Sequence, residues 1–229
     1  MKTLRSNRGP FRKRPYFTDT EIDAICADEL QRVGLLPSSP SAVRIDRFIE
    51  KRFGGPAEYE DLPDGILGLT RFGSKGVQAI ILSNSLDSDR SVPGARRVRT
   101  TLAHEGGHGL LHTHLFALGE TQPLFGDWSD ATKPKVLCRD HEGTAYQGEW
   151  WELQANKAIG ALLMPKTLVL AAAQPFMNSV GTLGAQRIRE ADRKKAVREL
   201  AEIFDVNPVV ARIRLEGIAP EAESSQLPL

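Results

Sequence analysis

The sequence predicts an α+β fold that is mainly helical and contains a small antiparallel sheet. Apolar residues recur at helical spacing over most of the 229-residue chain. The exception is a pair of short apolar runs, residues 66–72 and 77–82, which are separated by the turn sequence Gly73-Ser74-Lys75-Gly76 and are typical of a β-hairpin. The composition, 41% hydrophobic and 26% charged, is that of a globular protein with a buried core.

The N-terminal part begins with residues 1–17, which contain six basic residues and no acidic ones. Prolines and glycine interrupt this segment, and we expect a basic flexible tail. Two amphipathic helices follow over residues 18–33 and 41–53. Thr18 or Thr20 can cap the first helix, and Gly54-Gly55-Pro56 ends the second.

The later elements are again mostly helical. We expect a helix over 96–116, an aperiodic loop over 117–149, a strong helix over 150–164, a charged amphipathic helix over 186–204 and a last short helix over 207–215. The predicted organisation is a tail (1–17), one domain (18–175), a C-terminal helical segment (176–217) and a second flexible tail (218–229).

Charge and composition exclude several classes of protein. A formal net charge of +1 argues against a protein that works by covering nucleic acid. The two cysteines, Cys26 and Cys138, are too few for a disulfide scaffold or a four-cysteine zinc site. The sequence contains no 18-residue apolar stretch, and no apolar segment follows the basic N-terminus. We therefore expect a cytoplasmic protein without a membrane partner.

All five histidines fall between residues 104 and 141, and two of them form the pattern His104-Glu105-Gly106-Gly107-His108. In a helix, positions i and i+4 share one face, so both imidazoles can bind one metal ion. Glu105 lies further round the helix, where it can reach a metal-bound water. Zinc lowers the pKa of such a water to about 7, and Glu105 would take its proton and pass it to the leaving amine.

A catalytic zinc site needs a third protein ligand, and spacing leaves two candidates. His114 has the offset of the long motif H-E-x-x-H-x-x-G-x-x-H, but Leu111 stands where that motif requires glycine. Glu152 opens the helix over 150–164. Asn156 follows four residues later on the same face, where it can accept a hydrogen bond from the far nitrogen of a ligating histidine.

Two segments resemble the ImmA/IrrE family of metallopeptidases. Residues 99–108 (RTTLAHEGGH), with Leu110-Leu111-His112, are similar to the signature helix of that family, and residues 152–156 (ELQAN) with 161–165 (ALLMP) are similar to its second motif. The segment 59–72 also resembles the family's N-terminal part. The resemblance implies a zincin-like, gluzincin-like fold. It also implies Zn²⁺ bound by His104, His108 and Glu152, with Glu105 as general base.

Other residues near these motifs are weaker candidates. His141, Tyr146 or Tyr59 could donate a hydrogen bond to a tetrahedral oxyanion. His112 continues the row of histidines one turn beyond the metal, where a packing role or a role beside the ligands is expected. Trp150 and Trp151 are expected to anchor the ligand helix in the core. The three glycines at 106, 107 and 109 each cost about 1 kcal/mol in a helix, and they would permit close approach of another backbone.

The predicted function is a zinc-dependent endopeptidase that acts on a protein or peptide, such as a transcriptional repressor or an antitoxin. We expect the substrate to pair with strand 77–82 as an edge strand, and loop 117–149 to serve as a lid or specificity loop. The alternative is a regulatory DNA- or protein-binding module with a vestigial or sensory metal site. Residues 196–215 faintly resemble a helix-turn-helix, in which Arg212 and Arg214 would contact DNA, but a plain helical pair packed on the domain fits them better.

Overall fold

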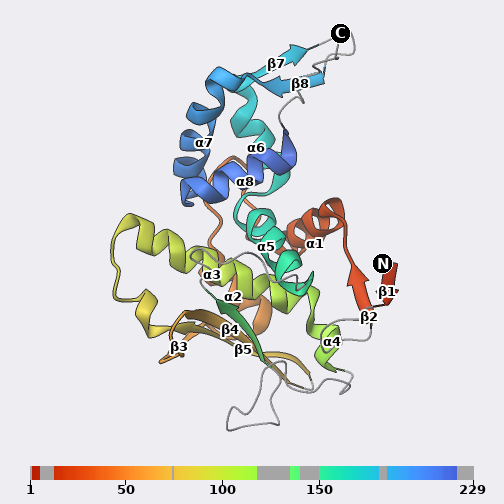
Figure 1. Ribbon diagram of the computed structural model, residues 1–229, viewed down its shortest axis with the longest axis vertical. Helices are drawn as coiled ribbons and strands as arrows, with labels where there is room; N and C mark the ends of the chain where they lie inside the picture. The colour runs from red at the N-terminus through yellow and green to blue at the C-terminus, as the bar shows by residue number, and fades with distance from the viewer. Residues whose placement is uncertain are drawn as a thin grey trace, which may run out of the picture.

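The computed structural model describes residues 2–5, 13–73, 75–117, 135–139, 150–180 and 185–220. The architecture is α+β (Figure 1). The helices are α1 (Asp19–Arg32), α2 (Ile45–Phe53), α3 (Val92–Leu111), α4 (Thr113–Ala117), α5 (Trp150–Leu163), α6 (Lys166–Ala173), α7 (Glu190–Phe204) and α8 (Pro208–Ile218). The strands are β1 (Lys2–Arg5), β2 (Lys13–Tyr16), β3 (Glu58–Glu60), β4 (Ile66–Gly73), β5 (Gly76–Ser83), β6 (Lys135–Arg139), β7 (Met177–Val180) and β8 (Ala185–Ile188).

The first helix begins where the sequence indicates. Thr18 caps α1 by accepting a hydrogen bond from the backbone N–H of Glu21 at 3.2 Å, and the Glu21 carboxylate accepts one from the backbone N–H of Thr18 at 2.8 Å. This reciprocal arrangement is a capping box. The second helix is shorter than expected, because it begins at Ile45 rather than near Ser41, and it ends at Gly54 in the left-handed conformation (φ 88°).

The central sheet has four strands in the order β3-β5-β4-β6. The predicted hairpin is confirmed as β4 and β5, which pair antiparallel. The prediction of a purely antiparallel sheet is wrong, because β3 runs parallel to β5. The prediction that strand 77–82 is an edge strand is wrong at its C-terminal end, because β3 pairs with residues 81–83 of β5. Within the described residues, β3 does not extend along residues 77–80. A three-residue strand such as β3 carries no periodicity that would reveal its partner.

Short strands lie in three segments for which the sequence predicts none. The segment 117–149 is not aperiodic throughout, because β6 pairs antiparallel with β4. The helix expected over 186–204 begins at Glu190, and the residues before it form β8, which pairs with β7. In the N-terminal segment, predicted to be an irregular tail, β1 and β2 pair antiparallel. In each case the segment is a strand because it pairs with another strand, and its own sequence periodicity does not indicate this.

The central helix α3 lies across one face of the sheet, with α5 beside it (Figure 1). It begins earlier than expected, at Val92, where the Ser91 hydroxyl accepts from the backbone N–H of Gly94 at 3.2 Å. It ends at Leu111 instead of running on to Phe116, because the chain turns at His112 before α4. Because of this turn, His114 lies in a different helix from residues 104–108.

The C-terminal helices share the hydrophobic core of the rest of the chain. Leu200, Phe204 and Leu215 are fully buried in the same cluster as residues of α1, α2, α3 and α5. Two arginines of α3 bind the α7–α8 junction: Arg96 Nε donates to Asp205 Oδ1, and Arg99 Nε donates to the backbone O of Asp205, both at 2.9 Å. Within the described ranges, no single helix is long and apolar enough to cross a membrane. The pair α5 and α6 passes that test of length and composition only as a unit bent by 57°.

Candidate metal centre

Three glycines let other elements approach the histidine-bearing part of α3. A Cβ on Gly107 would lie 2.7 Å from Ala158 Cβ and 3.3 Å from the backbone of Ala155, so α5 packs directly against this turn. A Cβ on Gly109 would lie 2.6 Å from the ring of Phe53, at the end of α2. The Gly107 contact is the close approach of another backbone that the sequence predicts, and α5 lies beside α3 (Figure 1).

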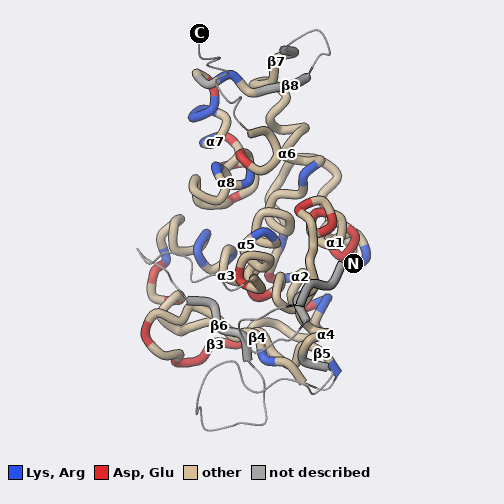
Figure 2. Tube along the Cα trace, turned by 45° about the vertical axis from the view of Figure 1, so that its right-hand side comes forward, with Lys and Arg blue, Asp and Glu red and all other residues tan. Residues whose placement is uncertain are grey.

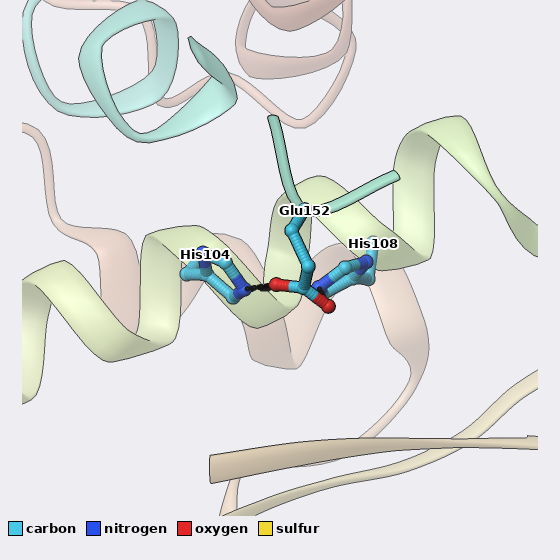
Figure 3. Close-up of side chains that lie close together, drawn as sticks. All are labelled: His104, His108 and Glu152. Carbon is cyan, nitrogen blue, oxygen red and sulfur yellow. Dashed lines mark hydrogen bonds and ion pairs between the residues drawn. The ribbon is translucent and has the colours of Figure 1, made fainter. Parts of the chain in front are cut away.

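His104, His108 and Glu152 converge between α3 and α5 (Figure 3). The two histidine Nε2 atoms lie 2.9 Å apart. Glu152 Oε2 is 3.1 Å from His104 Nε2, and Glu152 Oε1 is 3.6 Å from His108 Nε2. The ligand atoms all lie within 4.8 Å of one another, so this group could hold a metal ion.

The outer nitrogen of His104 has a partner that sets its tautomer. His104 Nδ1 lies 3.1 Å from Asn156 Oδ1. An amide oxygen only accepts hydrogen bonds, so Nδ1–H donates and Nε2 keeps a lone pair. That lone pair faces the other members of the group, as a metal ligand requires. The structure therefore brings Asn156 to the position that the spacing of 152 and 156 indicates.

Burial and charge set the protonation of the group. Burial opposes ionisation of Glu152, but the two neighbouring imidazoles hold the pKa of its carboxyl below the ordinary value. Burial lowers the pKa of His108, although Glu152 counteracts this effect. The metal-free group is thus biased toward a carboxylate and a neutral His108. These are the forms in which such side chains bind a cation.

The structure distinguishes the two candidates for a third ligand, Glu152 and His114, by their positions. Among the described residues, the group that could hold a metal contains Glu152 and not His114. His114 lies in α4, beyond the turn at His112, and its side chain is exposed. Leu111 in place of the motif's glycine predicts a helix that runs on and carries His114 away. In the structure α3 instead ends at Leu111, and the change of direction at His112 separates His114 from the group.

Glu105 points to the sheet rather than to α5. Its side chain is fully buried against β4, where the Thr70 hydroxyl donates to Glu105 Oε2 at 2.6 Å. Glu105 Oε1 has no hydrogen-bond partner within the described part of the chain. Burial raises the pKa of Glu105 to about 8, against the opposing effects of His104 and Thr70. A cation held by the adjacent ligands would favour the carboxylate form, which a general base needs.

Gly68 makes room for this carboxyl group. A Cβ at residue 68 would lie 2.8 Å from Thr101 Cγ2 and 3.0 Å from Glu105 Oε1. The sequence gives no indication of the roles of Gly68 and Thr70, because they reach Glu105 only through the packing of β4 on α3. A small residue followed two positions later by a hydroxyl on the same face of a strand is the one weak local sign.

The remaining candidates lie in different places. His141 and Tyr146 fall outside the described residues. Tyr59 lies on β3, which β5 separates from β4, and its side chain is 45% exposed. Trp150 and Trp151 are buried, as expected for anchors of the ligand helix, and the Trp150 ring meets the His112 ring edge-on at 5.7 Å.

His112 and Gln154 make contacts beside the three converging side chains, and the sequence predicts only part of this arrangement. His112 is buried beside His108, with 2.9 Å between their Nδ1 atoms, and its Nε2 lies 3.0 Å from Gln154 Oε1. The i, i+4 row of histidines places His112 near the site. Gln154 was not a candidate, although it stands between Glu152 and Asn156 in the same helix.

Neither a scan against models of known protein families nor a search among curated proteins finds a match to this chain.

Proposed function

We propose that the protein is a zinc-dependent endopeptidase of zincin-like fold, related to the ImmA/IrrE family. The observation that carries the proposal is the convergence of His104, His108 and Glu152, with Glu105 in the next position of the same helix. Two imidazoles and one carboxylate are a donor set that suits zinc, and three protein ligands leave a position open for water or substrate.

Chemical roles follow from where each side chain lies. When bound, zinc supplies polarisation of a carbonyl and lowers the pKa of a coordinated water to near neutrality. His104, His108 and Glu152 would hold the ion. Glu105, aligned by Thr70, would take a proton from the attacking water and return it to the amine that leaves. Its burial excludes solvent that would otherwise compete for that proton.

The substrate class proposed is an extended segment of a protein, such as a repressor or an antitoxin. Because β3 occupies the outer edge of β5 at residues 81–83, β5 is not the strand along which we place the peptide. The outer strand next to β4 is β6, and β4 carries the Thr70 contact to Glu105. We therefore propose that the substrate adds to the sheet beside β6, where main-chain hydrogen bonds supply affinity.

The DNA-binding alternative receives less support from the C-terminal helices. The Arg214 guanidinium donates to Asp23 Oδ1 at 2.6 Å and to the backbone O of Met164 at 3.0 Å, and its side chain is only 11% exposed. Arg212 pairs with Glu216 at 2.9 Å. Figure 2 shows that acidic and basic residues are interspersed along α7 and α8. A peptidase is therefore the function we propose.

The test compares wild type with Glu105→Gln and Glu152→Ala. After reconstitution with zinc, wild type and Glu105→Gln should each hold about one zinc per chain, and Glu152→Ala should hold little. Only wild type should cut peptides of a proteome-derived library, with products read by mass spectrometry. Zinc loss in Glu105→Gln would contradict the assignment of Glu105 as base. Equal cleavage by wild type and Glu105→Gln would contradict the proposal that the protein is a peptidase.

A further inference from the structure

A chain of buried polar contacts leads from the metal centre to the N-terminal hairpin. His108 Nδ1 lies 2.9 Å from His112 Nδ1, and His112 Nε2 lies 3.0 Å from Gln154 Oε1. Gln154 Nε2 in turn donates to the backbone O of Pro15, at 2.9 Å, in β2. His108, His112 and Gln154 are each no more than 4% exposed, and Pro15 is buried as well. This series of hydrogen bonds thus joins three elements that are distant in sequence: α3, α5 and β2.

The direction of every hydrogen bond in this chain follows from its far end. The Pro15 carbonyl can only accept, so it takes a hydrogen from the Gln154 amide nitrogen, and the amide oxygen is turned toward His112. That oxygen also only accepts, so His112 carries its hydrogen on Nε2. His112 is buried, and its hydrogen-bond contacts are an imidazole and an amide rather than a carboxylate. A neutral ring that donates from Nε2 has Nδ1 left as an acceptor.

The last link fixes the metal ligand. Because His112 Nδ1 accepts, His108 must donate from its own Nδ1. The neutral His108 ring then has a lone pair on Nε2, the atom that lies 2.9 Å from His104 Nε2 and 3.6 Å from Glu152 Oε1. The opposite tautomer would place a hydrogen on the ligand atom and leave two Nδ1 lone pairs facing each other.

We propose that His112 and Gln154 are positioning residues, which hold His108 in its metal-binding tautomer through a relay that ends on the Pro15 carbonyl of the N-terminal hairpin. The two histidine ligands are therefore supported differently. His104 is oriented in one step by Asn156, whereas His108 depends on a relay of two side chains and a separate strand. This inference rests on the metal-binding half of the proposed function, and it extends that centre to β2.

Burial makes the relay consequential. In a solvated site, water would replace a missing partner at little cost, but a buried group that loses its partner bears the full desolvation penalty. Without the Gln154 oxygen, the buried His112 gains by moving its hydrogen to Nδ1 or by turning its ring. Either change removes the acceptor that His108 requires.

The experiment measures zinc affinity of the full chain by competition with a chromophoric chelator. Gln154→Met keeps the length of the side chain and removes both polar atoms, and His112→Phe removes the middle of the relay. Each should weaken zinc binding about 10- to 100-fold, the usual effect of losing a partner that orients a ligand. The matched control is Leu153→Ala, a half-exposed position between Glu152 and Gln154, which should keep wild-type affinity.

The double variant separates a relay from two independent structural defects. If both residues act through His108, Gln154→Met combined with His112→Phe should lose no more affinity than the worse single variant. Losses that multiply, or wild-type affinity in folded Gln154→Met, would overturn the proposal.

Nitrogen-15 NMR of the metal-free wild type gives a readout that depends on neither zinc nor variants. Two-bond proton–nitrogen correlations distinguish the tautomers of each ring. The expected spectrum shows His108 protonated at Nδ1 and His112 at Nε2, and the reverse assignment would overturn the relay. If wild type binds no zinc, the proposed function fails, and this spectrum still decides the inference.

Discussion

The two sides of α3 around residues 104–108 are built on different principles. The side toward α5 is polar and fully partnered: His104 meets Asn156, and His108 meets His112 and Glu152. The side toward β4 holds one carboxyl group, Glu105, in a fully buried site. The Thr70 hydroxyl donates to its Oε2, and its Oε1 has no hydrogen-bond partner within the described residues. The first arrangement holds ligands ready for a cation. The second keeps a carboxyl group poorly solvated, which makes it a stronger base.

This difference has a consequence for the dependence of stability on pH. Burial raises the pKa of Glu105 in the folded state to about 8, so between its ordinary pKa and pH 8 the folded protein binds a proton that the unfolded chain has released. The contribution of Glu105 to the free energy of unfolding is therefore fully present below pH 4.5 and is lost as the pH rises from 4.5 to about 8. His112 has the opposite sign, because burial lowers its pKa and its contribution is lost as pH falls below 6.5.

The largest expected effect comes from removing the buried acid. In the metal-free protein, Glu105→Gln removes the free-energy cost of the proton that Glu105 must take up on folding above pH 4.5. Relative to wild type it should gain on the order of 3 kcal/mol between pH 4.5 and pH 7. Urea unfolding of both proteins across this range measures the difference. The control is His112→Phe, whose gain over wild type should instead increase toward acid pH. A pH-independent difference for Glu105→Gln would show that Glu105 has an ordinary pKa.

The second prediction concerns the contact that brings the two helices together. Gly107→Ala should destabilise the protein by about 1–3 kcal/mol, because its Cβ would lie 2.7 Å from Ala158 Cβ and 3.3 Å from the α5 backbone, and close packing cannot absorb it. The helix propensity of alanine offsets only about 1 kcal/mol of that cost. Zinc affinity should fall as well, since the shift carries Glu152 away from α3.

Gly106→Ala is the matched control for this prediction. Its Cβ would meet the flexible end of Ile49, Cδ1, at 3.0 Å, and no backbone atom is as close. This variant should be neutral or slightly stabilising in urea unfolding. If Gly106→Ala and Gly107→Ala had equal effects, the separation of α3 and α5 would not depend on residue 107.

Spacing along one element predicted the site wherever the chemistry lies on one helix. The i, i+4 rule places His104 and His108 on one face, and the offset of Asn156 from Glu152 places both on another. Spacing could not choose between His114 and Glu152, because that depends on the turn at His112. Thr70, Gly68 and Gln154 were missed for a related reason. Each reaches the site only through the packing of separate elements, which no local pattern encodes.

The fold shows the same division. Six of the helices (α1, α2, α3, α5, α7 and α8) and the β4–β5 hairpin follow from periodicity and turn residues, with errors of up to about five residues at their ends. The sequence predicts neither α6 nor the break that separates α4 from α3. β3 and β6 do not follow from local patterns. β3 is a strand because it pairs with β5, and β6 is a strand because it pairs with β4. Among the described strands, those two place β5 between β3 and β4 and make β6 the outermost strand beside β4. The strand proposed to receive the substrate was therefore beyond what the sequence could indicate.

The smallest expected effect tests the sheet side of α3 directly. Thr70→Val keeps the shape of the side chain and removes the hydroxyl that donates to Glu105 Oε2 at 2.6 Å. Losing one hydrogen bond of about 1.5 kcal/mol to a charged group should lower kcat about 10-fold. KM and zinc content should be unchanged, because Thr70 lies among neither the ligands nor the outer strand. Thr70→Ser restores the hydroxyl and should recover most of the rate. If the serine variant were as slow as the valine variant, the loss would come from packing in β4, and the base would be held by burial alone.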